Sequence, residues 1–283
     1  LDWILIYGKF GFPALGLKGA ALATMISNII AAVGIFIAIL KSRRLPFTFS
    51  KKALLRPKWQ LYKKTLEVGM PIGIEALLWY LGQLILVRFL NQIDSMAIGV
   101  YSLVNGIQSI PLFIYLGIAK AAMTKVGQYW GDEEYQEALS IGLYCQKLAS
   151  ICVIVFSVAF FIFPRHFAGI FTADVQVLDR AVPLIRLSGI FINVQALNVV
   201  MGNAIRATGD TKWMLYSQIA GTIFIVSIAP VMIFGLSLGL KGMYITMIVD
   251  EGIRGAINYA RFYYGKNPFE KWTSTLKAFV SKT

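Results

Sequence analysis

An acidic residue inside an apolar run is the clearest chemical feature of this sequence. Glu75 stands in the run 68–90, where Arg88 is the only other charged residue. Because burial disfavours the charged form of a carboxyl group, an acid in this setting can take up and release a proton, or exchange it for Na⁺ or an organic cation. Alternatively, Glu75 is hydrated or paired with a neighbouring helix and only fixes packing. We interpret Glu75 as an ion- or proton-coupling residue.

Two further side chains share a helical face with Glu75. Trp79 and Gln83 follow it at intervals of four residues, so the three form one stripe on a helix. A carboxylate, an indole ring and an amide oxygen together suit an organic cation, by charge and by cation–π attraction. A lipid-facing Trp79 is the alternative interpretation.

Polar stripes of the same kind recur in two other apolar runs. Amide side chains in hydrocarbon need hydrogen-bonding partners, so bonds between helices would explain one stripe, whereas three stripes favour a single water-filled cavity. We therefore predict a substrate cavity lined by Trp79, Gln83, Tyr101, Asn105, Gln108, Gln195 and Asn198, with Ser188 and Gly202 on the face of the last two.

A compact group of charges lies in the last apolar run, 242–264. Arg254 follows Asp250 by four residues and Glu251 by three, which places all three side chains on one helical face. Arg254 can then neutralise either acid. We interpret Asp250, Glu251 and Arg254 as a structural charge cluster.

Helix-bending and turn-forming residues indicate where parts of the molecule can move. Pro71 and Pro111 lie within or near the ends of apolar runs and should kink or loosen those helices. Gly209 and Asp210 favour a tight turn between two further runs, directly after Arg206. We interpret these five as hinge and inner-mouth residues, with plain packing irregularity as the alternative at the prolines.

Composition defines the setting in which these residues act. Hydrophobic residues make up 57% and charged residues 14% of the 283 residues, against roughly 25% charged in an average soluble domain. The stretches 19–40, 95–119, 187–205 and 213–240 contain no Asp, Glu, Lys or Arg. Each reaches the roughly 20 residues that span a bilayer as a helix. The sequence predicts an all-α integral membrane protein, a polytopic helical bundle, and excludes a soluble enzyme.

Motifs for catalysis, metal binding or nucleic-acid binding are not found in the sequence. The single histidine, His166, cannot build a histidine metal site, and no HExxH, CxxC or GxxxxGK[ST] motif occurs. The net charge of +13 comes from basic residues beside the apolar runs, without the interleaved aromatics of a nucleic-acid surface. We expect no enzymatic activity, metal, cofactor or nucleic-acid partner, and a lipid bilayer as the surroundings.

The distribution of Lys and Arg predicts the orientation. With the runs 68–90, 138–164 and 242–264, the expected spans number seven. The segment 41–64 holds nine Lys and Arg residues and no acid, which places it in the cytoplasm by the positive-inside rule. Alternation puts 18 loop Lys and Arg residues inside and six outside. We expect a multi-pass protein of the plasma membrane, in bacteria the inner membrane, with a cytoplasmic C-terminus.

A short repeat predicts a larger, two-lobed parent. LGLKG occurs at 15–19 and at 238–242, and each copy opens an apolar run that ends near a basic segment. If these runs correspond, five further spans would precede residue 1, giving twelve helices in two six-helix lobes. We expect a remnant of the N-terminal lobe at 1–40, a basic cytoplasmic linker at 41–64, the six-helix C-terminal lobe at 65–264, and a cytoplasmic tail at 265–283 that is either an amphipathic helix or a frayed terminus. The missing N-terminal lobe is the expected partner.

Four segments resemble those of multidrug and toxic compound extrusion (MATE) transporters. GKFGFPALGLKGAALATMIS (8–27) is similar to the start of the family's sixth helix, and VGMPIGIEALL (68–78) to that of its seventh. VGQYWGD (126–132) and IRATGDTK (205–212) resemble signatures after the eighth helix and between the tenth and eleventh. The resemblance implies twelve helices in two lobes, and export of organic, often cationic, compounds against inflow of H⁺ or Na⁺.

The sequence departs from this family at two positions. Well-studied members carry an acid one turn after Glu75, where Trp79 stands, and another on the tenth helix, where Gln195 stands. Ion coupling would therefore depend mainly on Glu75. The expected function is a secondary active transporter that exports small organic cations in exchange for H⁺ or Na⁺ by alternating access of two lobes. The alternatives are a lipid-linked saccharide flippase of the same superfamily, with Lys147 and Arg186 as mid-span cations, or a non-transporting membrane fragment.

Overall fold

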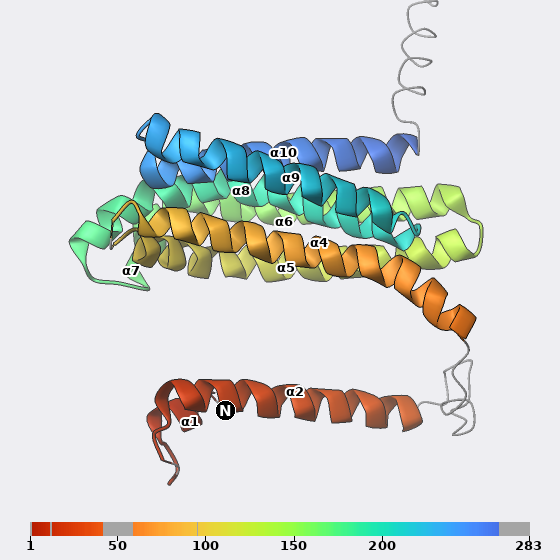
Figure 1. The fold of residues 1–283 in the computed structure, drawn as a ribbon, viewed down its shortest axis with the longest axis horizontal. Helices are drawn as coiled ribbons and strands as arrows, with labels where there is room; N and C mark the ends of the chain where they lie inside the picture. The colour runs from red at the N-terminus through yellow and green to blue at the C-terminus, as the bar shows by residue number, and fades with distance from the viewer. Residues whose placement is uncertain (1, 12, 42–58, 95, 266–283) are drawn as a thin grey trace, which may run out of the picture. The chain divides into compact units, whose positions relative to one another are not determined.

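Every regular element that the structure describes is a helix. The computed structural model describes residues 2–11, 13–41, 59–94 and 96–265 (Figure 1). The all-α class predicted from the composition is confirmed. The predicted tail and most of the predicted linker lie outside the described residues.

The chain divides into two compact units, residues 1–62 and 63–283, and each is described by itself. The first unit contains α1 (Asp2–Tyr7) and α2 (Gly16–Lys41). α1 corresponds to the predicted end of a helix at 1–8, and α2 to the charge-free run that follows it.

The first LGLKG copy shapes the start of α2. The amide of Leu15 donates a hydrogen bond to the carbonyl of Leu5 over 3.0 Å. A Cβ at Gly19 would lie 2.3 Å from the same carbonyl oxygen, so only glycine allows this approach. Gly16 begins the helix with a φ of +54°, a conformation that glycine adopts without strain.

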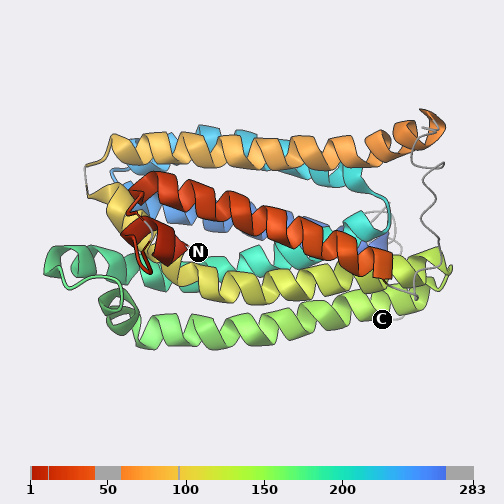
Figure 2. The same cartoon turned by 90° about the horizontal axis from the view of Figure 1, so that it is seen from below.

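Long helices that run alongside one another build the second unit (Figures 1 and 2). A short helix and a π-helical turn join them on the chain. Their bounds are α4 (Trp59–Asn91), α5 (Ala97–Gly131), α6 (Tyr135–Ile162), α7 (Pro164–Gly169), α8 (Val175–Ala207), α9 (Thr211–Pro230), η1 (Val231–Gly235) and α10 (Gly239–Tyr264). Since α4 begins at Trp59, the last residues of the predicted linker are helical.

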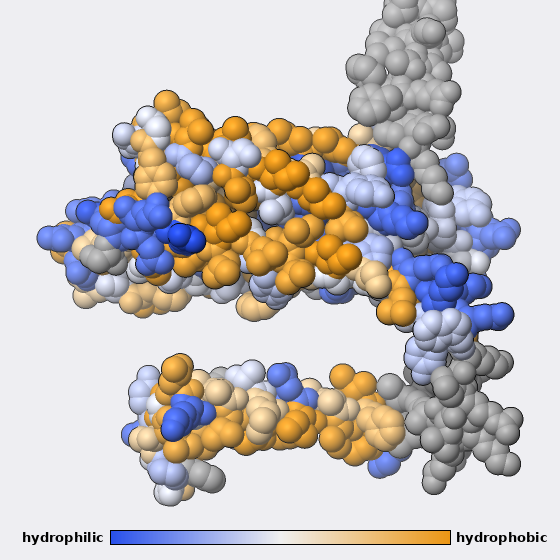
Figure 3. Space-filling model, viewed as in Figure 1, coloured by the Kyte–Doolittle hydropathy of each residue, from blue (hydrophilic) through white to orange (hydrophobic). Residues whose placement is uncertain are grey.

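α8 lies at the centre of this unit. It packs against α5, α6 and α10, and the large side chains of Tyr115, Phe160 and Tyr244 fill the space among these helices, each with at most 1% of its surface exposed. In Figure 3 apolar side chains cover the middle of the bundle, and hydrophilic side chains gather at its two ends. This distribution suits a bundle that crosses a hydrocarbon layer.

Six of the described helices are long and apolar enough to cross a membrane, namely α2, α4, α5, α6, α8 and α9 with its continuation η1. The sequence predicted seven spans. α10 is as long as α2, at 26 residues, but is not sufficiently apolar. Its central charges, Asp250, Glu251 and Arg254, are buried inside the bundle.

The second LGLKG copy builds the same helix start as the first. Gly239 begins α10 with a φ of +52°. The amide of Leu238 donates to the carbonyl of Met232 over 3.3 Å, and a Cβ at Gly242 would lie 2.6 Å from that oxygen. The shared φ, hydrogen bond and glycine contact support the interpretation of LGLKG as a repeat.

Asp94 joins the ends of three helices at one end of the bundle. Its Oδ1 accepts hydrogen bonds from the amides of Met96 and Ala97, each over 2.8 Å, which caps the first turn of α5. Asp94 lies just beyond the end of α4, and its Oδ2 accepts a hydrogen bond from Arg180 of α8 over 2.5 Å. The hydrogen bond from Arg180 lowers the pKa of the Asp94 carboxyl below its ordinary value of 3.8, and the two amide bonds add to this.

Replacing Asp94 by alanine should destabilise the bundle by about 1 kcal/mol, as the loss of a helix cap typically does. Asp94→Asn retains a capping oxygen and loses only the charge, so its effect should be smaller. Because the folded pKa is lowered, the carboxylate stabilises the fold above pH 3.8 and this contribution is lost as the pH falls through the folded value. Thermal unfolding in detergent between pH 7 and pH 3 measures both effects. An Asp94→Asn deficit that persists unchanged at pH 3 would contradict the role of the charge.

Candidate functional site

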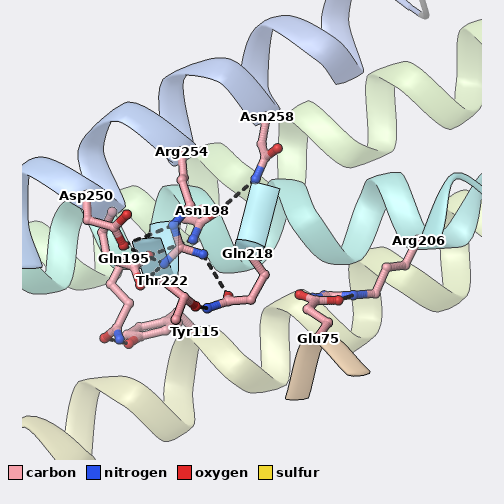
Figure 4. Close-up of polar contacts among 11 residues, drawn as sticks. Glu75, Tyr115, Gln195, Asn198, Arg206, Gln218, Thr222, Asp250, Arg254 and Asn258 are labelled. Carbon is pink, nitrogen blue, oxygen red and sulfur yellow. Dashed lines mark hydrogen bonds and ion pairs between the residues drawn. The ribbon is translucent and has the colours of Figure 1, made fainter. Parts of the chain in front are cut away.

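A guanidinium group bound to two carboxylates lies in the interior of the second unit (Figure 4). Arg254 donates from Nε and Nη2 to Asp250 Oδ2, over 3.0 and 2.8 Å. Nη2 also donates to Glu251 Oε1 over 2.8 Å. These contacts follow from the helical spacing of three and four residues on α10, as the sequence predicted.

Two neighbouring helices complete the shell around this group. From α9, Gln218 Oε1 accepts from Arg254 Nη1 over 2.9 Å. From α8, Asn198 donates to Glu251 Oε2 over 2.6 Å, and its own oxygen accepts from Asn258 over 2.7 Å. The network therefore fixes α8, α9 and α10 relative to one another through charged and amide groups.

The charges of this α10 cluster do not balance. The side chains of Asp250, Glu251 and Arg254 are 2%, 9% and 9% exposed, so water screens them poorly. Two ionised carboxylates and one guanidinium leave one negative charge. From their spacing, the three residues were interpreted as a structural cluster in which Arg254 can neutralise either acid. The geometry shows that one guanidinium is shared by two acids.

One carboxylate oxygen of the cluster remains without a hydrogen bond among the described residues. Both oxygens of Glu251 accept one, whereas Asp250 accepts only through Oδ2. Asp250 Oδ1 faces Gly221 of α9, where a Cβ would lie 2.7 Å from it and 2.7 Å from Arg254 Nε. Glycine at this position lets α9 approach the cluster.

A groove between α9 and α10 reaches the α10 cluster. Its volume is about 320 Å³, and Asp250, Gly221 and Arg254 form part of its lining. The rest is mainly aromatic and aliphatic: Trp213, Tyr216, Ala220, Phe224, Ile253 and Ile257. A buried negative charge at the wall of an aromatic groove is an arrangement that attracts organic cations.

Glu75, the predicted coupling residue, forms an ion pair with Arg206, which the sequence analysis assigned to the inner mouth. Arg206 Nη2 bonds to Glu75 Oε1, and Arg206 Nε donates to Glu75 Oε2 over 3.3 Å. The pair joins α4 to α8 and is electrically neutral. The pairing with a neighbouring helix that was named as the alternative for Glu75 is therefore present.

Hydrogen bonds between helices engage several of the predicted cavity residues. They bridge α4 to α5, α5 to α10 and α5 to α8, which is how buried amides and hydroxyls are satisfied in an apolar bundle. The bonds run from the Tyr101 hydroxyl to Gln83 (3.1 Å), from Gln108 to the Tyr244 hydroxyl (3.1 Å) and from the Tyr115 hydroxyl to Gln195 (2.5 Å).

Of the remaining predicted cavity residues, Asn198 belongs to the shell of the α10 cluster. Trp79 is 40% exposed and meets Tyr80 edge to face at 5.0 Å, and Asn105 is half-buried on α5. Their place in a substrate cavity stays a prediction. Pro71 and Pro111 lie inside α4 and α5.

The turn between α8 and α9 has the conformation that the sequence indicated. Gly209 has a φ of +85°, which glycine tolerates best. Asp210 accepts two hydrogen bonds from Arg261 of α10, over 2.7 and 3.2 Å. The Arg261 guanidinium also lies over the Trp213 ring, 4.4 Å from its centroid. These contacts tie the turn to the last helix.

The contribution of α9 to the α10 cluster was not predicted from the sequence. Gln218 contacts Arg254 and donates to Thr222 over 3.2 Å, yet both lie in the charge-free run 213–240 that was interpreted only as a span. Their spacing of four residues was the available signal. Tyr115 and Tyr244 were missed as well, because tyrosine in an apolar run is indistinguishable from ordinary core.

Comparison with known proteins gives consistent matches. The MatE family model matches residues 71–231. A probable multidrug resistance protein NorM of Thermotoga maritima is 30% identical over 267 residues, which cover 94% of this chain and 57% of that protein. The uncharacterized transporter YisQ of Bacillus subtilis is 28% identical over 268 residues, covering 92% and 57%. The chain thus spans just over half the length of these relatives.

Solved structures share the fold. A crystal structure of MATE in the straight conformation aligns with a TM-score of 0.79 at 20% identity, covering 100% of this chain and 60% of that one. The outward-facing conformation of a multidrug resistance MATE family transporter of the MOP superfamily aligns with a TM-score of 0.81 at 19% identity, covering 93% and 58%.

Gly221→Ala tests the close approach of α9 to the α10 cluster. The added methyl group would lie within 3 Å of atoms in both Arg254 and Asp250, so we expect a loss of about 1–3 kcal/mol from overpacking. Gly117→Ala, on α5, is the matched control: its Cβ meets nothing within 4 Å, and alanine there should be neutral or stabilise the helix by up to about 1 kcal/mol. Thermal unfolding in detergent compares the two. Equal stability of both variants would contradict the packing described here.

Proposed function

This chain belongs to the MatE family, and from that membership we propose that it forms one lobe of a secondary transporter that exports small organic cations in exchange for protons or Na⁺. The family's relatives include transporters rather than enzymes, and the described helices suit a multi-pass membrane protein. Alternating access, in which two lobes expose a central path to each side in turn, is the proposed mechanism.

The observation that carries this proposal is the α10 cluster with its excess negative charge. Ionisable residues inside a membrane protein are costly and generally serve ion or substrate movement. A fold stabilised only by packing would not require two buried acids for one base, since replacing buried ion pairs by apolar residues is often neutral or stabilising. An unbalanced negative charge suits exchange between cations.

Several features support a second lobe as the partner. Within the first unit, α2 packs against the short helix α1 and leaves most of its apolar side chains exposed, including Ile30 and Val33. The internal repeat shows that α2 starts as α10 does, although α10 is packed against α8 and α9 within one body. A preceding lobe of matching design would cover α2 as its own last helix.

A contact between an acid and an arginine marks each end of the bundle. Asp94 and Arg180 lie at one end of the bundle, and the turn at Gly209 lies with Arg261 at the other. We propose that the second end faces the cytoplasm of a plasma membrane, in bacteria the inner membrane. The Lys and Arg asymmetry of the loops supports this.

The flippase alternative is less well supported. It would need free cations facing a cavity to hold a pyrophosphate. Lys147 and Arg186, the mid-span candidates, have exposed side chains on the described bundle. Arg206 and Arg254, which are more deeply placed, are both bound to carboxylates. The buried electrostatics therefore favour a cationic substrate.

Reconstitution tests the proposed exporter. The full-length parent in proteoliposomes should move a fluorescent organic cation such as ethidium when a pH or Na⁺ gradient is imposed, because the exchanging ions share one negative site. Residues 1–283 alone should give the rate of protein-free vesicles, since the second lobe is needed to close the path. An ethidium transport rate of the full-length protein that is the same with and without a pH or Na⁺ gradient would contradict ion-coupled export. Dye transport by residues 1–283 alone would contradict the two-lobe requirement.

A further inference from the structure

We propose that Asp250 of α10 is the residue at which this protein takes up its coupling proton, and that Glu75 does not serve this purpose. This assignment rests on the proposed function and names the ion and the residue for it. The proton and the organic cation would compensate the excess negative charge of the α10 cluster in turn.

The hydrogen bonds of the α10 cluster distinguish one of its carboxylate oxygens from the others. Asp250 Oδ2 and both oxygens of Glu251 accept hydrogen bonds from Arg254 or Asn198. Asp250 Oδ1 accepts none among the described residues. A proton can therefore add to Oδ1 without displacing a donor, and the protonated cluster, with Arg254 and Glu251 still charged, is neutral.

The α10 cluster also suits a proton better than Na⁺. Hard cations surround themselves with several oxygen ligands. The neighbouring oxygens of Gln218, Thr222 and Glu251 already accept hydrogen bonds from Arg254, Gln218 and Asn198. Asp250 Oδ1 is the one carboxylate oxygen of the α10 cluster that accepts no hydrogen bond among the described residues, and a proton needs only one oxygen.

The groups that face Asp250 from other helices leave its charge uncompensated. From α9 they are Gly221 and the neutral Gln218. The neutral groups nearby on α8 and α5 are engaged elsewhere, because Asn198 donates to Glu251 and the Tyr115 hydroxyl donates to Gln195. The charged groups beside it on α10 are Arg254 and Glu251, which are part of the charge balance of the cluster given above.

Glu75 is the other buried acid near the cluster. It acts electrostatically on Arg254, but Arg206 holds it in a bidentate ion pair. A proton added to Glu75 would break that pair and leave Arg206, whose side chain is 19% exposed, without its counter-ion. Removing one member of a buried pair is unfavourable because it strands the other charge. Asp250 can take up a proton without such a loss, because Arg254 keeps Glu251 as its counter-ion.

The internal repeat provides an independent comparison. In the register of the two LGLKG copies, Ser27 and Asn28 of α2 correspond to Asp250 and Glu251, and Ala31 corresponds to Arg254. α2 forms a helix of the same length with the same φ at its first residue. The charges are thus not required to build this kind of helix, which favours a functional reason for them on α10.

The groove between α9 and α10 explains how the proton and the substrate compete. Trp213, Tyr216 and Phe224 line it, with Asp250 at its wall. With Asp250 ionised, the excess charge attracts an organic cation to these aromatic faces. When the proton adds to Oδ1, the cluster becomes neutral and the cation loses its counter-charge. One proton taken up thus accompanies one positive charge released.

Asp250→Asn in the full-length protein tests the assignment, since the amide imitates the permanently neutral state. In proteoliposomes we expect the rate of ethidium efflux driven by a pH gradient to fall to that of protein-free vesicles. Glu75→Gln should remain dependent on the pH gradient even where its rate is lower. Asp179→Asn, with a 59% exposed side chain, is the matched carboxylate-to-amide control and should resemble the unaltered protein. Gradient-driven efflux by Asp250→Asn, or loss of gradient dependence in Glu75→Gln, would overturn the assignment.

A binding measurement keeps the assignment testable without transport. Adding tetraphenylphosphonium to weakly buffered, purified full-length protein should release protons from the unaltered protein and from Glu75→Gln, and none from a folded Asp250→Asn. If Asp250→Asn does not fold, a Glu75→Gln variant shown by its thermal unfolding to be folded decides: proton release from it supports Asp250, and loss of release refutes the assignment.

The two proposals fail in different ways. An unaltered protein without gradient-driven efflux refutes the exporter. An active unaltered protein with an active Asp250→Asn refutes only the site.

Discussion

The binding of one guanidinium by two carboxylates inside an apolar bundle is the interaction on which the rest of this structure depends. Arg254 cannot be buried without its acids, and each acid oxygen needs a donor or a proton. These requirements explain why α8 presents Asn198, why α9 presents Gln218, and why Gly221 stands at the closest approach. The excess negative charge follows from the same arrangement.

The two buried groups of charges differ in their balance, and this separates their roles. Glu75 and Arg206 form a neutral pair that joins α4 to α8. The α10 cluster has one acid more than it has bases, and its groove is lined by aromatic residues. A neutral pair stabilises one arrangement of helices, whereas an unbalanced cluster needs an exchangeable cation. The acid that is easiest to recognise in the sequence is therefore not the one we propose for coupling.

Local sequence patterns predicted the helices, but not which side chains on different helices contact one another. Charge-free runs and the LGLKG repeat have local causes, namely hydrophobicity and glycine conformation, so they indicated α2, α5, α8 and the start of α10. Glu75 and Arg206 are 131 residues apart, and Asn198 and Glu251 are 53 apart. Such pairs depend on how whole helices pack, which no spacing within one helix reveals. The spacing of Asp250, Glu251 and Arg254 was visible, but not the oxygen that lacks a donor.

Infrared difference spectroscopy of the purified full-length protein measures the central charge most directly. Lowering the pH should produce a carbonyl band of a protonated carboxylic acid in a buried site. The account predicts that this band is present in the unaltered protein and in Glu75→Gln, and absent in Asp250→Asn. A band that persists in Asp250→Asn and disappears in Glu75→Gln would contradict it.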